Sequence, residues 1–377
     1  MFVTCCNELL LVGHHVFPTE PGVRHWLDVS RRRKGEGSVE RHEVNGSENV
    51  EAMISFNGAS KTYPDGTVAV HPLDLQVRTG EVCVLVGPSG CGKTTTMRMV
   101  NRLQEPTTGT VSVNGRDVMT VPLRELRLGI GYVIQQIGLF PHLTVRKNVA
   151  TVCGLLKWDK ATTNDRVDEM LELVGLPAAE FGDRYPHQLS GGQRQRVGVA
   201  RALAADPPVL LMDEPFGAID PIARLNLQNE FLALQQRVKK SVVIVTHDID
   251  EAVRLGDRIA VMREGGFLDQ YATPAEVLGA PATDFVAQFT GSDRTLKLLA
   301  VTPVESGELE PVEAKDDKLP LVAGDKSLRE ALAVLLDSTQ GRVRVGSENH
   351  VDGVLTMDGV HRALRLSTAH QKASSVA

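Results

Sequence analysis

Residues 87–94 of this sequence read GPSGCGKT. The stretch fits the pattern G-x-x-x-x-G-K-[ST], and it stands between an apolar run at 81–86 (EVCVLV) and a helical pattern at 94–103. Its glycines allow successive backbone N–H groups to face phosphate oxygens, and the start of the following helix adds a favourable dipole. We expect Lys93 to reach the β- and γ-phosphates of a nucleotide and the Thr94 hydroxyl to bind Mg²⁺. A glycine-rich turn without a ligand is the alternative for this stretch alone.

Two carboxylates follow a second apolar run. Residues 208–212 read PVLLM, a buried-strand pattern, and Asp213 and Glu214 come directly after it. We expect Asp213 to hold Mg²⁺ through water and Glu214 to act as the general base toward an attacking water. A general base contributes about 10²–10⁴-fold to a rate. The alternative is an acidic strand end that caps the next helix, and the phosphate loop upstream favours the metal-binding interpretation.

A second turn of small residues reads LSGGQ at 189–193, and a helical pattern at 197–204 follows it. Ser190, Gly191 and Gly192 offer backbone donors near a helix start, which is a favourable place for an anion. One chain therefore carries two candidate phosphate-binding loops.

The apolar runs also indicate the fold class. The run at 241–246 (SVVIVT) joins those at 81–86 and 208–212, and helical patterns separate them. Continuous β-rich runs that alternate with helices predict a mainly parallel sheet covered on both faces, so the fold is α/β. The stretch at 144–205 is mostly helical in pattern and is expected to be an inserted helical subdomain.

With these motifs in this order, residues 53–291 resemble the ATP-binding cassette (ABC) family. The resemblance implies a P-loop NTPase core with an added antiparallel β part, and it implies ATP and Mg²⁺ as cofactors. It also implies a head-to-tail homodimer in which the LSGGQ loop of one copy covers the nucleotide held by the other. The residues implied in nucleotide binding are Tyr63, Gly87, Pro88, Ser89, Gly90, Cys91, Gly92, Lys93, Thr94, Thr95, Ser190, Gly191, Gly192, Gln193 and Asp220.

The same resemblance assigns individual roles. Tyr63 is expected to stack on adenine, and Asp220 to communicate across the dimer. Gln135, in GYVIQQ, is expected to sense Mg²⁺ and to face a membrane partner, with Gln136 as the rival for that role. His247, in VTHD, is expected to contact the γ-phosphate. The catalytic set is therefore Glu214, His247 and Gln135, and the metal set is Thr94, Gln135 and Asp213; Ile219 stands where many relatives carry Leu.

Composition excludes several classes of protein. The chain is 42% hydrophobic and 23% charged with a formal net charge of −6, so no basic surface for nucleic acid is expected. No run of about 18 uncharged apolar residues exists, so any membrane-spanning part must come from other chains. The five cysteines are odd in number and lack framework spacing, which indicates reduced thiols in a cytosolic setting.

The two ends of the chain differ from the cassette. Residues 1–52 are expected to be a disordered extension, with Met53 as an alternative start, and 292–318 has a linker-like composition. Residues 319–366 predict a small α/β unit, and 367–377 is expected to be a loose tail. The unit's expected elements are strands at 319–322, 342–346 and 351–356 and helices at 327–338 and 358–366. Ser327 and Glu330 fit a capping box at the first of these helices.

The single uninterrupted cassette favours a separate importer subunit. Repair and chromosome ATPases of this family carry long coiled coils, translation factors usually carry two cassettes, and exporters commonly carry membrane helices; none of these is readable here. The apolar loop at 137–142 (IGLFPH) is expected to receive a helix from a membrane permease.

The C-terminal unit suggests a substrate class. Residues 319–338 and 351–364 resemble one CBS motif, which implies the quaternary-amine uptake family and substrates such as glycine betaine, choline, carnitine or proline betaine. That family implies two permease subunits, an external substrate-binding protein and a peripheral place on the cytoplasmic face of the plasma (inner) membrane. Relatives usually carry a tandem CBS pair, so the single motif either pairs with that of a second copy or is a remnant that packs. The alternatives are an importer of amino acids or polyamines, or a soluble ABC ATPase outside transport.

Overall fold

The structure is a computed structural model of the 377-residue chain, and it describes residues 52–135, 138–217, 220–304, 309–313, 316, 318–347 and 350–374. Residues 366–374 are described by their backbone. The expected extension before Ala52, the rival glutamine at 136, Ile137 and Ile219 lie outside the described residues.

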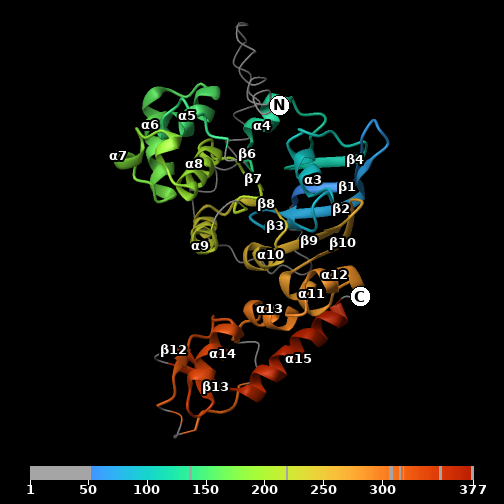
Figure 1. Cartoon of the computed structure of the whole chain (residues 1–377), viewed down its shortest axis with the longest axis vertical. Coiled ribbons are helices and arrows are strands. Elements are labelled where there is room, and N and C mark those ends of the chain that lie inside the picture. Colours follow the sequence, from blue (N-terminus) through green and yellow to red (C-terminus); the bar gives the residue numbers. More distant parts are fainter. Residues whose placement is uncertain are drawn as a thin grey trace, which may run out of the picture. The chain divides into compact units, whose positions relative to one another are not determined.

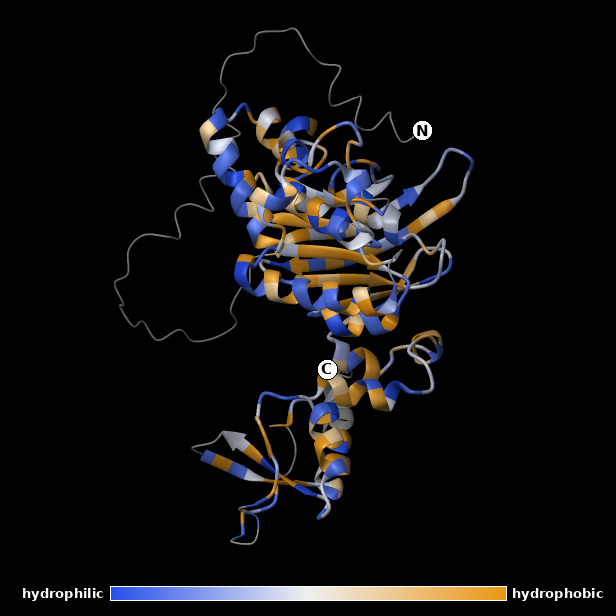
Figure 2. Ribbon diagram, turned by 60° about the vertical axis from the view of Figure 1, so that its left-hand side comes forward, coloured by the Kyte–Doolittle hydropathy of each residue, from blue (hydrophilic) through white to orange (hydrophobic). Residues whose placement is uncertain are grey.

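The centre of the cassette is a six-stranded sheet with the order β10-β9-β3-β8-β7-β6 (Figure 1). All neighbours are parallel except β9 and β10, which are antiparallel. Every residue of β3, β7 and β8 is buried, which confirms the three predicted apolar strands, and Figure 2 shows strands of the central sheet as hydrophobic ribbons. The strands are β3 (Val82–Val86), β6 (Ile130–Val133), β7 (Val209–Asp213), β8 (Ser241–Thr246), β9 (Arg258–Arg263) and β10 (Phe267–Ala272).

A second, antiparallel sheet has the order β2-β1-β4-β5 and confirms the expected antiparallel part of the fold. Its long strands alternate buried and exposed residues, as a sheet with one covered face does. Its strands are β1 (Ala52–Thr62), β2 (Val68–Arg78), β4 (Thr108–Val113) and β5 (Arg116–Asp117).

Helices connect the parallel strands and surround the core. Helix α3 begins at Lys93, directly after the phosphate-binding loop, and ends at Val100, before the predicted end at 103, because Arg102 takes a left-handed conformation (φ 52°). The remaining helices of this part are α4 (Leu123–Leu128), α9 (Pro221–Val238), α10 (Ile249–Leu255), α11 (Pro274–Gly279) and α12 (Asp284–Phe289).

The stretch at 144–205 is helical, as predicted, and Figure 1 shows its helices as one group. They are α5 (Val145–Leu155), α6 (Lys160–Leu173), α7 (Ala178–Phe181), the 3₁₀ turn Pro186–Gln188 and α8 (Gly191–Leu203). The predicted start of the last helix, at 197, is wrong: α8 begins at Gly191. Ser190 caps it in a capping box with Gln193, which satisfies backbone donors of the first turn and extends the helix upstream.

The expected linker at 292–318 is wrong in its first half, where helix α13 runs from Arg294 to Val301. Two of its leucines are buried in different apolar clusters. Leu298 belongs to the cluster of the cassette, and Leu299 to the cluster of the C-terminal unit. The linker expectation rested on prolines and charges that begin only at Pro303, whereas the apolar stretch before Pro303 forms the helix.

The C-terminal unit has a three-stranded sheet with the order β11-β12-β13, mixed parallel and antiparallel. Its elements are β11 (Leu321–Val322), α14 (Leu328–Asp337), β12 (Arg342–Ser347), β13 (His350–Thr356) and α15 (Met357–Ser374). The capping box of Ser327 and Glu330 is confirmed. The tail expected to be loose from 367 is helical as far as Ser374, because α15 packs on α11 and its Leu364 contacts both apolar clusters. Among the described helices, none is long and apolar enough to cross a membrane.

Two neighbouring leucines of α14 give a matched test of the C-terminal core. Leu335 is 2% exposed and Leu336 is 70% exposed. We expect Leu335→Ala to lower the local free energy of unfolding by about 2–5 kcal/mol, because it leaves a cavity in the core. We expect Leu336→Ala to change that free energy by less than about 0.5 kcal/mol. Hydrogen exchange of the β12 amides measures both, and equal effects of the two substitutions would contradict the packing described.

Candidate nucleotide-binding site

The phosphate-binding loop is held tightly between its neighbours. Gly87 and Gly92 have φ angles of 153° and 88°, in the region that favours glycine. A Cβ atom on Gly87 would lie 2.0 Å from the carbonyl oxygen of Met262, and one on Gly92 would lie 2.3 Å from that of Ala69. The backbone itself therefore requires these two glycines, besides any requirement of a ligand.

The Lys93 side chain folds back onto the loop residues that precede it. Its Nζ donates to the carbonyl oxygens of Gly87 and Pro88, each at 2.7 Å, and approaches the Sγ of Cys91 at 3.6 Å. The side chain is buried, so the ammonium group is fixed close to the backbone that would surround a phosphate. Burial raises the pKa of the Cys91 thiol, with Lys93 opposing that shift, so the loop carries one cation and a neutral thiol.

Two of the three residues expected to hold a metal ion, Thr94 and Asp213, meet at the end of β7, whereas the third, Gln135, contacts Glu214. The Thr94 hydroxyl donates to Asp213 Oδ1 at 3.1 Å, and Arg98 Nη2 lies 3.6 Å from Asp213 Oδ2. Burial raises the pKa of Asp213, while the hydrogen bond from Thr94 and the charge of Arg98 lower it. A hydroxyl and a carboxylate are hard oxygen donors, and Mg²⁺ prefers a few such protein ligands together with phosphate oxygens. The residues present therefore fit Mg²⁺.

The three residues expected to be catalytic lie together, and two of them approach the carboxylate of the third, Glu214. Gln135 Nε2 donates to Glu214 Oε2 at 2.8 Å, and His247 Nδ1 lies 3.5 Å from Glu214 Oε1. Glu214 has a φ of 43°, an unusual value for a residue other than glycine, and its amide donates to the carbonyl oxygen of Val245 at 2.9 Å. Gln135 follows β6, Glu214 follows β7 and His247 follows β8, so the parallel sheet brings them together.

Tyr63 lies beside the same loop. Its hydroxyl is 3.5 Å from Thr95 Oγ1, and Lys61 Nζ is 5.6 Å from the centroid of its ring. The ring is half-buried, so it keeps an accessible surface next to the start of α3. This placement fits an aromatic platform for a base whose phosphates lie in the loop.

The second loop lies apart from the first within one chain. Ser190 caps α8 and Asp220 caps α9, the latter through a hydrogen bond from the Ala223 amide at 3.0 Å. Across the described residues, no hydrogen bond or ion pair joins 190–193 to 87–95. Figure 1 shows α8 among α5, α6 and α7, whereas α3 lies beside β1 and β2. The structure therefore does not combine Ser190, Gly191, Gly192, Gln193 and Asp220 with the phosphate loop of the same copy.

Sequence reasoning missed two residues at this site. Arg98 follows Thr94 by four positions, which places both on one face of α3, and this spacing could have identified it. Glu251 is buried in the first turn of α10, and its Oε2 accepts a hydrogen bond from Thr246 Oγ1 at 2.9 Å. The amide of Asp248 donates to the same hydroxyl at 3.1 Å. Glu251 thus contacts Thr246 directly, and the amide of Glu251 donates to Asp248 Oδ1 at 3.3 Å, so both neighbours of His247 are held by hydrogen bonds.

Comparison with known proteins agrees with this geometry. The family model described as ABC transporter matches residues 70–217. The glycine betaine/carnitine/choline transport ATP-binding protein OpuCA of Bacillus subtilis (strain 168) is 45% identical over 307 residues, which is 81% of this chain and 76% of that protein. The osmoprotectant import ATP-binding protein OsmV of Salmonella typhimurium is 53% identical over 254 residues, 67% of this chain and 66% of that protein.

A solved structure shows the same cassette fold. The dimeric structure of MJ0796, a bacterial ABC transporter cassette, superposes with a TM-score of 0.53 at 34% identity, covering 59% of this chain and 99% of that one. The chain belongs to the ATP-binding proteins of ABC transporters, in the group that includes those named for glycine betaine, carnitine and choline transport.

Proposed function

We propose that this chain binds and hydrolyses Mg-ATP to energise the uptake of quaternary-amine osmoprotectants, such as glycine betaine, choline, carnitine or proline betaine, through a separate permease. The observation that carries the ATPase part is the convergence of Gln135 and His247 on Glu214, at 2.8 and 3.5 Å. The substrate class rests on the relatives. The match to the glycine betaine/carnitine/choline protein is longer than the span 53–291, so it extends beyond the cassette.

The residues divide the work of hydrolysis. Lys93 and the loop amides neutralise and orient the phosphates, and Tyr63 supports the base. Thr94, Asp213 and Gln135 would hold Mg²⁺, which supplies charge neutralisation at the phosphate oxygens. Glu214 accepts the proton of the attacking water as the γ-phosphoryl group transfers to that water, which gives ADP and phosphate. His247 donates a hydrogen bond to the γ-phosphate, so each polar group acts where charge develops.

The second loop requires a second copy. Ser190 to Gln193 and Asp220 stand away from the loop at 87–94 of the same chain, and both lie at helix starts, where anions are favoured. Two copies placed head to tail would bring each LSGGQ loop onto the partner's nucleotide and would complete two equivalent sites. The similar MJ0796 cassette is described as dimeric.

The transport complex needs further partners. The loop at 138–142 is partly exposed, and Phe140 and His142 contact each other edge to face at 6.0 Å between ring centroids. It begins three residues after Gln135, so a permease helix seated there would contact the segment that carries a residue expected to be catalytic. Two permease subunits, an external substrate-binding protein and a peripheral place on the cytoplasmic face of the plasma (inner) membrane complete the proposal, and no nucleic acid takes part.

The C-terminal unit is proposed as a single CBS-like module. Its small core, which includes Leu299, Leu328 and Val343, is shared with α13. This sharing offers the extra buried surface that a unit of this size needs.

The first test of the function is Glu214→Gln, which keeps the size of the side chain and removes the base. We expect the ATP hydrolysis rate to fall by about 10²–10⁴-fold while Mg-ATP binding is retained. In cells deleted for this gene, we expect labelled betaine or choline uptake to return with the wild-type gene and not with the variant. Uptake that never depends on the gene would reject the substrate class and leave the ATPase proposal standing. Hydrolysis at the wild-type rate by the variant would reject the role of Glu214.

A mixing experiment tests the shared site. Lys93→Ala removes the ammonium group from the phosphate-binding loop, and Ser190→Glu places a negative charge in the LSGGQ loop. Each variant alone is expected to be inactive. An equal mixture forms heterodimers that keep one intact composite site, so we expect roughly a quarter of the wild-type ATPase activity. A mixture no more active than the separate variants would show that each copy works alone.

The buried Glu251 predicts a dependence of stability on pH. Burial raises its pKa from 4.5 to about 7. The folded chain therefore keeps a proton that the unfolded chain loses, and this stabilisation is complete below the unfolded pKa and is lost as the pH rises through about 7. We expect the wild type to lose on the order of 3 kcal/mol relative to Glu251→Gln between about pH 5 and pH 8.

Calorimetric unfolding of both proteins across this pH range measures the difference. Glu264→Gln, at an exposed position, is the matched control and should follow the wild type. Parallel pH profiles for the wild type and Glu251→Gln would contradict the prediction.

A further inference from the structure

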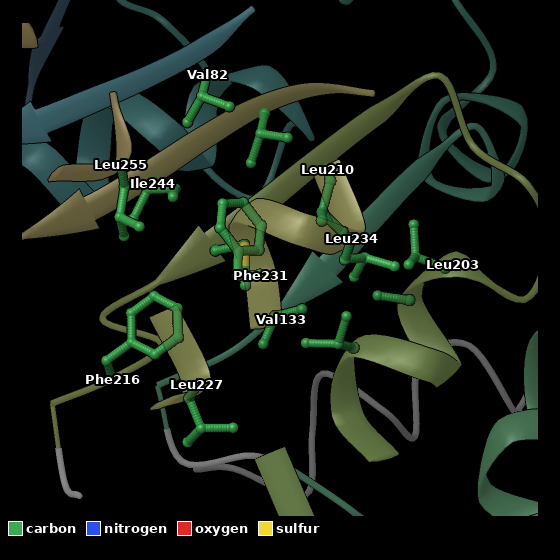
Figure 3. Packing of buried hydrophobic residues seen from close by; sticks show 14 of the residues in the cluster. Val82, Val133, Leu203, Leu210, Phe216, Leu227, Phe231, Leu234, Ile244 and Leu255 are labelled. Carbon is green, nitrogen blue, oxygen red and sulfur yellow. The ribbon is translucent and has the colours of Figure 1, made fainter. Parts of the chain in front are cut away.

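A cavity of about 340 Å³ lies among α6, α8, α9 and the end of β7, and its lining includes none of the residues expected to bind nucleotide. Its size is in the range of sites that take small organic molecules. Its interior is mainly apolar and includes Val199, Met212, Phe216, Leu227, Phe231 and Leu234. Figure 3 shows Phe216, Leu227, Phe231 and Leu234 among the packed side chains, and the rings of Phe216 and Phe231 meet edge to face at 6.3 Å.

Two polar side chains in the lining each carry a buried nitrogen donor without a partner among the described residues. Gln195 lines the cavity and is 4% exposed, and its Nε2 has no hydrogen-bond acceptor among the described residues. Arg196 also lines the cavity. Its Nη2 donates to Glu230 Oε1 at 2.7 Å, whereas its buried Nε has no acceptor in the same part of the chain. Buried polar groups are normally paired, because burial without a partner is costly in free energy. A ligand with a hydrogen-bond acceptor would pair these two donors.

The charged residues of the lining point to the same kind of ligand. Arg237 lines the cavity from α9 and is exposed, and no ion pair or hydrogen bond of its guanidinium is found in the described chain. Of the two acidic residues in the lining, Glu230 is already engaged by Arg196, and Glu172 is exposed to solvent. The buried polar atoms of the lining that lack a partner are therefore donors. A largely apolar ligand that carries a hydrogen-bond acceptor would match them.

The walls of the cavity lead directly to the nucleotide motifs. Met212 precedes the metal-binding Asp213, and Phe216 follows Glu214 by two residues. Helix α8, which carries Gln195, starts at Gly191 of the LSGGQ loop, and α9 starts after Asp220. A molecule that packs between these elements would favour one spacing of α8 and α9. Because the loops before these two helices belong to the expected nucleotide site, that spacing would affect the affinity for nucleotide.

From this arrangement we infer that the cavity is an effector site for a small, largely apolar carboxylic acid, whose carboxylate accepts hydrogen bonds from Gln195 and Arg196. Occupancy of the site changes the rate of ATP hydrolysis. Binding is independent of the proposed transport function, whereas the effect on rate rests on the proposed ATPase activity.

The test uses the full chain and two probes of similar shape, 1-naphthylacetate and 1-ethylnaphthalene, of which only the first carries an acceptor. Calorimetry and saturation-transfer NMR measure binding. We expect Gln195→Leu to weaken 1-naphthylacetate about 2–10-fold, the loss of one hydrogen bond, and to leave 1-ethylnaphthalene unaffected. Val199→Phe fills the cavity and is expected to weaken both probes more than about tenfold. Leu336→Ala, outside the cavity, is the control and should bind both probes as the wild type does.

The outcomes separate this inference from the proposed function. Failure of 1-naphthylacetate to bind the wild type at millimolar concentration, or equal binding to wild type and Val199→Phe, would overturn the site even if the chain hydrolyses ATP. If Gln195→Leu weakened the binding of both probes equally, the role of the carboxylate would be overturned. We expect the acid to change the wild-type ATPase rate at least about twofold and not that of Val199→Phe. Binding without a change in rate would overturn the effector role, and an inactive wild type would reject the proposed ATPase while binding still decides the site.

Discussion

The parallel pairing of β3, β8, β7 and β6 is the constraint on which the site depends. Parallel strands place their carboxyl ends at one edge of the sheet, and each of these strands ends in a residue or loop of the nucleotide site. The loop at 87–94 follows β3, Gln135 follows β6, Glu214 follows β7 and His247 follows β8. Gln135 and Glu214 are 79 positions apart in the chain, yet they share a hydrogen bond of 2.8 Å because of this pairing.

The buried strands also explain why the polar groups of the site are paired with one another. The carboxylate of Asp213 is almost fully buried at the end of an apolar strand, where an isolated charge would be costly. Thr94 and Arg98 from α3 contact it, and Lys93 is held by two carbonyl oxygens. Without a ligand, the charged groups of the loop and the strand end are thus paired with one another. A bound nucleotide or metal ion would replace some of these contacts with its own.

Much of this could be predicted from the sequence. Continuous apolar runs gave the three central strands, because strands buried on both faces lack polar positions, and the motifs located Lys93, Thr94, Asp213 and Glu214. The contacts of Arg98 and Glu251 were not predicted, because they depend on which helix face meets the strand ends. The helix at 294–301 was missed for a related reason: a short apolar stretch gives little periodicity, and what fixes it is that Leu298 and Leu299 are buried in two separate cores.

Helix α13, which carries both leucines, also contacts α10. Lys297 directly precedes the two leucines in sequence. Its Nζ lies 3.1 Å from Asp293 Oδ1 and 3.2 Å from Asp250 Oδ1. Asp250 is in the first turn of α10, and its amide donates to Asp248, the residue after His247. Lys297 therefore joins α13 to the first turn of α10. The same turn of α10 carries Glu251, whose carboxylate accepts a hydrogen bond from Thr246, the residue before His247. Among the described residues, α13 thus contributes Leu299 to the C-terminal core and an ion pair to the turn of α10 that follows His247.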